Sequence, residues 1–209
     1  MAAQLDFDEP DLIARLARLP SKLRVVFAAL CAERQLPNYI QFSKRSGWGN
    51  PNVLKDALES IWQDTQGQPL TKAELETILE RCMASIPSDE QDTKKEPAYA
   101  QDAAASVAYA IGARLTDDPK EAAWAARRAF EAVDYFVMSQ IDSTTIMGEH
   151  LRFALSQPIV QAELRRQQTD LQDLQLASAE KSLWASVISK LRDRARRDAE
   201  LFLNTAARQ

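Results

Sequence analysis

The chain has few of the residues on which common functional sites depend. Among its 209 residues are two cysteines, one histidine and five glycines. A single histidine, with no cysteine pair at ligand spacing, cannot form a typical His- or Cys-rich metal site, so we expect neither metal nor cofactor. Walker A loops, glycine-rich dinucleotide loops and G-x-S-x-G motifs are also missing. The sequence therefore predicts no particular reaction and leaves open whether the protein is an enzyme.

Long hydrophobic runs and a secretory signal are missing as well. No apolar stretch approaches the ~18 residues that a membrane span needs. The first ten residues, MAAQLDFDEP, are acidic and lack the basic and apolar regions of a signal peptide. We therefore expect a cytoplasmic protein without membrane contact, in which Cys31 and Cys82 remain reduced and pack as apolar groups.

Positive charge is scarce too. The formal net charge is -4 at pH 7, whereas non-specific binding of nucleic acid needs a dense positive field. The segment 190–197 is locally basic, but Asp193, Asp198 and Glu200 interleave with its lysine and arginines. A solvated helix face is the favoured interpretation of this segment, and we do not expect nucleic acid as a partner.

The residues that are present predict an all-α protein, a bundle of eight or nine helices. Apolar residues make up 45% of the chain and recur at helical spacing, and no hairpin turn signal appears. We expect a single domain over residues 1–209, with a sub-division at the polar loop 88–96. The predicted helices cover residues 9–18, 21–35, 37–46, 51–65, 71–85, 97–115, 119–139, 144–155 and 158–206.

Proline and capping residues set these boundaries. Proline is tolerated in the first helical turn, and Asn50-Pro51 and Asp118-Pro119 pair a good N-cap with such a proline. Pro37 is interpreted in the same way, as the start of a separate helix. Thr71 and Glu74 have the spacing of a capping box, and Gly47 fits a helix C-cap.

Two of the predicted helices are unusual. The helix at 97–115 carries small alanine side chains on every side, so we place it at the centre of the bundle. The segment 158–206 contains no glycine or further proline after Pro158 and would be about 75 Å long as one helix. It either breaks near residues 178–180, which we favour, or projects to pair with another chain.

A string within residues 33–62 resembles the uncharacterised bacterial YjaG-like family, a domain of unknown function. The matching features are Glu33-Arg34, Pro37-Asn38-Tyr39, Phe42, Gly47, Gly49 and Trp62, with weaker similarity at Ile86-Pro87-Ser88, Pro97, Asp102-Ala103 and Pro158. Trp48 stands where the family is expected to have Phe, and Asn50 where Asp is usual. The similarity extends over most of residues 10–200. It implies an all-helical soluble protein and no reaction.

Arg34 is the most distinctive candidate for a ligand site. It lies in an apolar stripe with Phe27 and Cys31, so its guanidinium should be partly buried and should need acidic partners. Glu33 lies on the flank, so Glu59 and Asp102 are the candidate partners, and Arg34 could instead cap the C-terminus of its helix. A structural ion pair is the favoured interpretation, and the alternative is a fork that holds a ligand carboxylate or phosphate.

Asn38 and Tyr39 extend that candidate site, because free N–H groups at a helix start can hold an anion. We favour a role for Asn38 in the local turn and for Tyr39 in packing. The alternative function is therefore a small-molecule (anion) binding protein or enzyme with a site formed by Glu33, Arg34, Asn38 and Tyr39. A nucleophile–base pair of Cys31 with His150 has no local support.

The favoured function is a non-catalytic binding or interaction module that is able to self-associate. Trp124, Arg128 and Tyr135 lie opposite the core stripe predicted for the helix at 119–139, and aromatic residues with arginine are typical of interaction surfaces. Trp48, between two glycines, either fills the edge of the core or anchors a partner. A second helix that covers the face of Trp124 is the competing interpretation.

Overall fold

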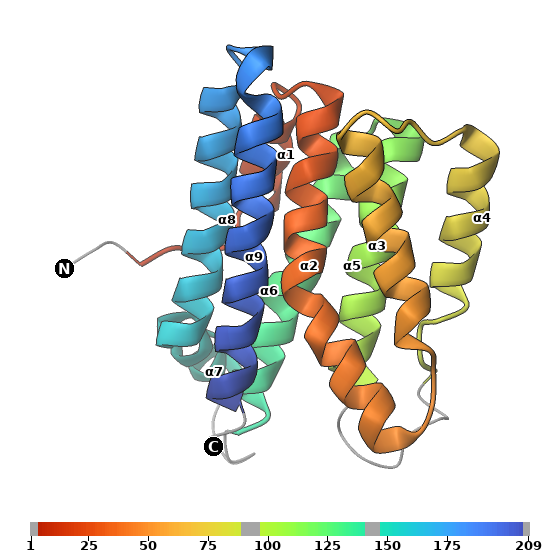
Figure 1. The fold of residues 1–209 in the computed structure, drawn as a ribbon. Helices are drawn as coiled ribbons and strands as arrows, with labels where there is room; N and C mark the ends of the chain where they lie inside the picture. Colours follow the sequence, from red (N-terminus) through yellow and green to blue (C-terminus); the bar gives the residue numbers. More distant parts are fainter. Residues whose placement is uncertain (1–3, 89–96, 141–146, 207–209) are drawn as a thin grey trace.

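The computed structural model describes residues 4–88, 97–140 and 147–206, and within these ranges the chain is helical with no strand (Figure 1). The prediction of an all-α bundle is confirmed. The elements are α1 (Glu9–Leu16), α2 (Ser21–Ser46), α3 (Pro51–Thr65), α4 (Lys72–Met83), α5 (Pro97–Thr116), α6 (Pro119–Met138), α7 (Met147–Ser156), α8 (Pro158–Ala177), the short 3-10 helix η2 (Lys181–Leu183) and α9 (Trp184–Ala206).

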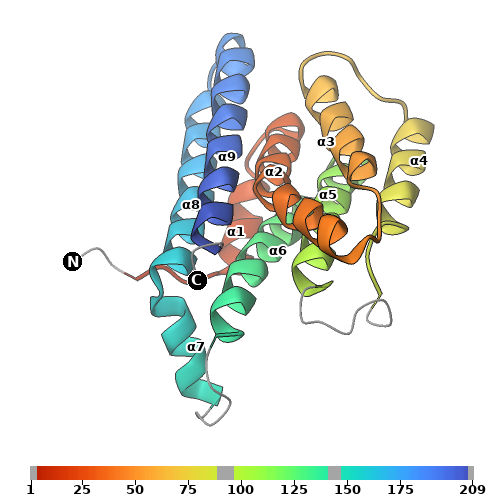
Figure 2. The ribbon, with the colours of Figure 1, turned by 60° about the horizontal axis from the view of Figure 1, so that its bottom comes forward.

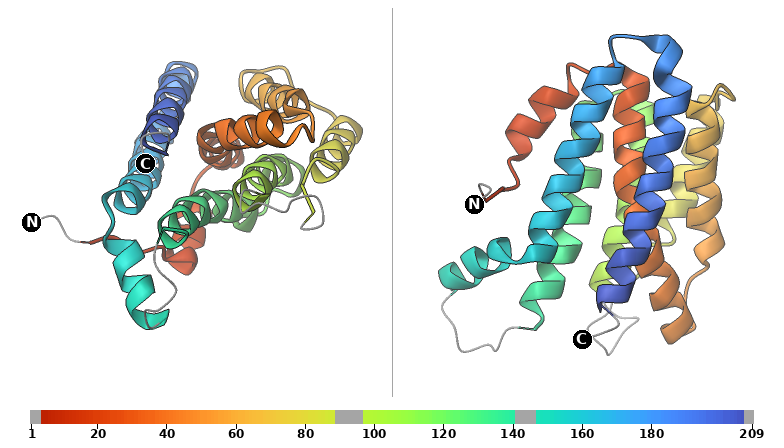
Figure 3. Two further views of the ribbon diagram at one scale, coloured as in Figure 1. Left: turned by 90° about the horizontal axis from the view of Figure 1, so that it is seen from below. Right: turned by 60° about the vertical axis from the view of Figure 1, so that its left-hand side comes forward.

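Helices α2 and α5 pack along each other in the middle of the molecule (Figures 1 and 2). Helices α3 and α4 lie on one side of this pair, and α8 and α9 lie on the other, while α6 packs on both central helices. The short helix α1 lies against α6 (Figure 3). The predicted central position of the alanine-rich helix is therefore shared with α2, in which every residue from Val25 to Gln35 is buried.

Helix α2 runs through Pro37, so the prediction of two helices at 21–35 and 37–46 is wrong. A proline inside a helix loses one backbone hydrogen bond and costs about 3 kcal/mol. Here Asn38, Tyr39 and Phe42 are all buried beyond the proline, and their packing offsets that cost. The direction of α2 changes part-way along its length (Figure 1), as in other proline-containing helices.

The predicted break in the segment 158–206 is confirmed. Helix α8 ends at Ala177, and α9 begins at Trp184 and runs back alongside it (Figure 3). The indole Nε1 of Trp184 donates a hydrogen bond to the carbonyl of Ala177 at 2.9 Å. This bond satisfies an end carbonyl of α8 and fixes the turn.

The predicted caps are present where the sequence placed them. The side chains of Asn50 and Asp118 accept hydrogen bonds from the first turns of α3 and α6. Thr71 and Glu74 form a full capping box at α4. Gly47 ends α2 in the left-handed conformation at φ 71°, which glycine adopts without strain. The loop 89–96 lies outside the described residues, and the single-domain prediction with a sub-division there stays a prediction.

Candidate functional site

Arg34 is buried between α2 and α8, with 3% of its side chain exposed. Its Nη1 lies 2.7 Å from Oδ2 of Asp170 and its Nη2 lies 3.0 Å from Oε1 of Glu163. Nη2 also approaches the sulfur of Cys31 at 3.5 Å. A buried guanidinium that is paired with two buried carboxylates is the arrangement that its place in an apolar stripe requires. A ligand anion would have to displace one of these carboxylates.

The partners predicted for Arg34 are wrong. Glu59 pairs instead with Arg192 of α9, and Asp102 of α5 accepts a hydrogen bond from Arg128 at 3.1 Å. The true partners lie 129 and 136 residues further along the chain. Only the packing of α8 against α2 brings them to Arg34.

Glu33 faces away from Arg34, toward α3 and α9. Its Oε2 accepts a hydrogen bond from Nε1 of Trp62 at 2.6 Å, and its Oε1 accepts one from Nε of Arg196 at 2.8 Å. The guanidinium of Arg192 lies over the Trp62 ring, 5.0 Å from its centre. Glu33 of α2 therefore links its own helix to α3 and α9.

Arg192 and Arg194 of α9 point toward neighbouring helices, so the solvated-face interpretation of this segment is wrong for Arg192, whose side chain is 12% exposed. Arg194 bridges Asp170 and Asp173 of α8 at 2.7 and 2.8 Å. Together with Arg196 on Glu33, these pairs hold α9 against α2, α3 and α8. Arg192, Arg194 and Arg196 are thus paired with protein carboxylates, whereas Arg197 is exposed.

Asn38 and Tyr39 form hydrogen bonds with residues that contact neither Arg34 nor Glu33 in the pairs described above. Nδ2 of Asn38 donates a hydrogen bond to Oε1 of Gln35 at 2.9 Å. The hydroxyl of Tyr39 donates one to the carbonyl of Ser85 at 2.9 Å, and burial raises the pKa of this phenol. The four residues of the predicted ligand site thus bind different neighbours.

Helix α5 covers much of the predicted interaction surface on α6. The ring of Trp124 lies 5.5 Å from that of Tyr109, Arg128 binds Asp102, and the ring of Tyr135 lies 5.3 Å from that of Tyr99. Tyr135 is nevertheless 38% exposed. Trp48 is half-buried and packs edge-on against Phe42 at 6.0 Å, at the edge of the core.

The contact between Asp102 and Arg128 predicts a pH dependence of stability. Burial raises the pKa of Asp102 to about 6 from 3.8, although Arg128 opposes the shift. Between these values the folded state keeps a proton that the unfolded chain releases, so the free energy of unfolding should fall as pH rises. Asp102→Asn should remove this fall and raise the free energy of unfolding at pH 7 by about 1–3 kcal/mol.

Urea unfolding of the wild-type protein and of Asp102→Asn, each at pH 4.0 and pH 7.0, measures this pH dependence of stability. In the variant Arg128 keeps Glu131 at 2.8 Å as a partner, so no guanidinium is left unpaired. The same change in stability between the two pH values in both proteins would contradict the prediction.

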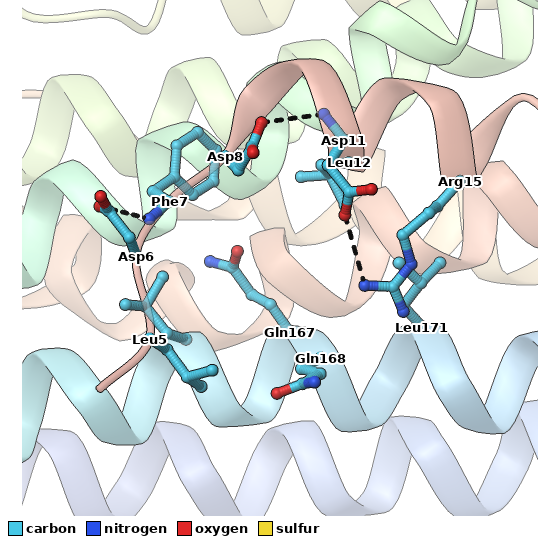
Figure 4. A pocket seen from close by; sticks show the side chains of 11 residues that line it. Leu5, Asp6, Phe7, Asp8, Asp11, Leu12, Arg15, Gln167, Gln168 and Leu171 are labelled. Carbon is cyan, nitrogen blue, oxygen red and sulfur yellow. Dashed lines mark hydrogen bonds and ion pairs between the residues drawn. The ribbon is translucent and has the colours of Figure 1, made fainter. Parts of the chain in front are cut away.

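A groove lies between the N-terminal segment and α8, and we call it the N-terminal groove (Figure 4). It has a volume of about 220 Å³. Its lining residues are Leu5, Asp6, Phe7, Asp8, Asp11, Leu12, Arg15, Leu164, Gln167, Gln168 and Leu171. No inference from the sequence pointed to this place.

Two contacts hold the outer wall of the groove in position. The amide of Gln161 on α8 accepts a hydrogen bond from the backbone N–H of Leu5 at 2.9 Å and donates one to its carbonyl at 2.8 Å. The ring of Phe7 stacks on that of Phe130 of α6 at 5.2 Å. Asp8 then caps α1 by accepting a hydrogen bond from the N–H of Asp11 at 3.0 Å.

Gln167 forms the floor of the groove and is 5% exposed. Its Nε2 donates to the carbonyl of Ala126 and to Oε1 of Glu163, both at 3.0 Å. Because both neighbours are acceptors, the NH₂ group must face them, and the carbonyl Oε1 must face the other way. Figure 4 shows this side chain rising from α8 into the groove. Its Oε1 has no hydrogen-bond partner among the described residues.

The sequence contains a pattern that could have identified Gln167 as a candidate residue. Helix α8 has an apolar stripe at Val160, Leu164, Leu171 and Leu174, and Gln167 falls within it at helical spacing. The argument that singled out Arg34, a polar residue in an apolar stripe, therefore applies equally to Gln167. The buried polar residues of α8 are Gln161, Glu163, Gln167 and Asp170.

The two thiols are free and buried, as predicted. Burial raises the pKa of Cys82 to about 12 and raises that of Cys31 further from its usual range. The side chain of His150 lies outside the described residues. Among the described side chains, no group of three or more His, Cys, Asp or Glu could hold a metal ion.

The comparison of sequences agrees with this architecture. Residues 11–200 match the profile of a family described as a protein of unknown function (DUF416). The chain belongs to the DUF416 family. In the described part of this DUF416 chain, no helix is long and apolar enough to cross a membrane.

Similar proteins support the assignment. Uncharacterized protein YjaG of Escherichia coli (strain K12) is 29% identical over 107 residues, which are 51% of this chain and 54% of that protein. The protein of the same name from Salmonella typhimurium is 28% identical over the same lengths. The matched region thus spans about half the length of these relatives. Their names and the family description assign no activity.

A solved structure shows the fold. The crystal structure of a DUF416 family protein from Shewanella baltica OS155 has a TM-score of 0.76 to this chain at 22% sequence identity. The match covers 88% of this chain and 92% of that one. The resemblance to the YjaG-like family, predicted from residues 33–62, is confirmed.

Proposed function

We propose that this DUF416 protein is a cytoplasmic, non-catalytic binding protein and that its ligand occupies the N-terminal groove. The observation that carries the proposal is the floor of that groove. The Gln167 side chain is 5% exposed, its NH₂ group is fixed by two acceptors, and its Oε1 has no protein partner among the described residues. An acceptor that faces a groove without a protein partner can take a hydrogen bond from a ligand donor.

The remaining candidate groups support the non-catalytic part of the proposal. The guanidinium of Arg34, the carboxylate of Glu33 and the hydroxyl of Tyr39 all bind other groups of the protein. The contacts of Arg34 and Glu33 each join two helices, and that of Tyr39 joins α2 to the turn after α4. They are therefore accounted for by the stability of the bundle.

The alternatives from the sequence stay predictions. A small-molecule site at Arg34, Asn38 and Tyr39 needs an anion that competes with Glu163 for the guanidinium. Self-association or a protein partner at Trp124, Arg128 and Tyr135 needs a surface that α5 partly covers. A ligand in the N-terminal groove would displace no protein carboxylate and would not require α5 to move away. For this reason we prefer the groove.

A fragment screen by NMR tests the proposal. We expect some fragments of about ten non-hydrogen atoms to shift the amide signals of residues 5–15 and 164–171 in ¹⁵N-labelled protein. Gln167→Leu should abolish these shifts, whereas Gln172→Leu, an exposed glutamine on the same helix, should leave them unchanged. Leu12→Phe, which adds bulk to the wall of the groove, should also abolish them. Shifts that gather elsewhere, or that survive in both groove variants, would contradict the proposal.

A further inference from the structure

We propose that the ligand of the N-terminal groove is an organic ammonium ion with a short apolar chain. This inference rests on the proposed function and names the chemistry of its ligand. Three features of the groove point to it, namely the acceptor at the floor, the charge at the rim and the apolar walls.

The amide of Gln167, at the floor of the groove, offers a ligand a hydrogen-bond acceptor and no donor. The NH₂ group of Gln167 is held between the carbonyl of Ala126 and Oε1 of Glu163. Glu163 is itself held by the buried Arg34 at 3.0 Å, so it has no freedom to turn and release the amide. The amide therefore presents only Oε1 to the groove, and a ligand that reaches it must bring an N–H or O–H donor.

The rim carries an excess of negative charge. Asp6, Asp8 and Asp11 are exposed there, and Arg15 is the one basic residue of the lining. Arg15 lies 3.7 Å from Oδ2 of Asp11 and is partly neutralised by it. Asp6 and Asp8 each use Oδ1 for a backbone N–H, at 2.8 and 3.0 Å, which leaves the second oxygen for a ligand. A cation is attracted to this rim, and a carboxylate is repelled.

The walls between floor and rim are apolar. Leu5, Phe7, Leu12, Leu164 and Leu171 line them. The volume of about 220 Å³ equals that of about seven water molecules in the liquid. A chain of four to six carbons fits this space, and its burial contributes to affinity as any apolar surface does. Floor, rim and walls together favour an alkylammonium ion over a neutral alcohol or an anion.

Two sources could supply this chemistry, a free aliphatic amine or the lysine side chain of a peptide. Both present an ammonium group on a short carbon chain. The probes are therefore n-pentylamine, 1-pentanol, pentanoate and the peptides acetyl-Ala-Lys-Ala-amide and acetyl-Ala-norleucine-Ala-amide. Each is titrated into the labelled full chain at pH 7 and low salt, and the dissociation constant is read from the shifts of the groove residues.

We expect n-pentylamine to bind at least tenfold more tightly than 1-pentanol, and pentanoate to bind more weakly still. A lysine peptide that binds more tightly than n-pentylamine, with the norleucine peptide weaker, identifies a peptide lysine as the source. The reverse order identifies a free amine. In either case added salt should weaken binding.

A variant that removes two negative charges from the rim of the groove provides a second test. Asp6→Asn with Asp8→Asn keeps both side-chain oxygens that accept backbone hydrogen bonds, since asparagine caps a helix as well as aspartate does. It should weaken n-pentylamine binding about three- to tenfold and leave 1-pentanol binding unchanged. Asp56→Asn with Glu80→Gln removes two exposed charges away from the groove and should change neither.

The outcomes separate the two proposals. Equal binding of amine, alcohol and carboxylate, or no effect of the Asp6 and Asp8 substitutions, overturns the ammonium assignment. Fragments that still occupy the groove in that case leave the proposed function standing. A groove in which neither fragments nor any of these probes shift the signals overturns both.

Discussion

Replacing Arg34 by methionine is expected to lower the free energy of unfolding by about 3–5 kcal/mol. The substitution removes the cation that lies between Glu163 and Asp170, each 3% exposed. Asp170 keeps Arg194 at 2.7 Å, whereas Glu163 is left with the more distant Arg166 at 3.9 Å. A buried charge that has lost its partner keeps its full cost of desolvation, which makes such a loss one of the larger effects of a single substitution. Urea unfolding followed by circular dichroism at pH 7 measures the change.

A triple variant distinguishes the loss of charge balance from the loss of packing. Arg34→Met combined with Glu163→Gln and Asp170→Asn removes all three buried charges and should recover most of the stability. Arg18→Met, at an exposed position, should change the free energy of unfolding by less than about 0.5 kcal/mol. If the triple variant were less stable than Arg34→Met alone, the ion pairs would not be the cause.

Replacing Trp62 by alanine is expected to cost about 3–5 kcal/mol as well, for a different reason. The indole is fully buried and is among the largest buried side chains of the core. Its removal leaves a cavity between α2, α3 and α9, and the surrounding helices close such a cavity only in part. Thermal and urea unfolding of the purified variant measure the loss.

The milder Trp62→Phe separates the two roles of the indole. It keeps most of the ring volume but removes the hydrogen bond from Nε1 to Glu33, so we expect about 1–3 kcal/mol, with Arg196 still bound to the same carboxylate. Trp48→Ala, at a half-buried tryptophan, is the matched control and should cost less than Trp62→Ala. Equal losses at the two positions would show that the depth of burial does not decide the effect.

The positions of most helices could be predicted because the signals that start and end them are local. A side chain that accepts a hydrogen bond from an N–H two or three residues away, such as Asn50 or Thr71, acts within one turn of chain. The break before Trp184 was favoured from length alone. Pro37 was interpreted wrongly, because a local rule for proline was outweighed by the burial of Tyr39 and Phe42 beyond it.

The candidate site could be predicted only in part. The apolar stripe around Arg34 was sufficient to predict that this residue is buried and needs acidic partners. It was not sufficient to identify Glu163 and Asp170, because an apolar stripe specifies which face of α2 is covered but not which helix covers it. The same limit applies to Trp124, whose exposure depends on where α5 lies.

The amino-acid sequence by itself determined the helical class, the caps and the need of each buried charge for a partner. These follow from interactions within a few residues and from the cost of burying a charge. The tertiary structure alone decided which partners meet, that Arg192 and Arg194 of α9 turn inward and that Gln167 faces a groove with its acceptor unpaired. These depend on how α8 and α9 pack against α2, and on the N-terminal segment that Gln161 holds against α8. Contacts such as Arg34 with Asp170 and Leu5 with Gln161 join residues more than a hundred positions apart, and no local pattern encodes such pairs.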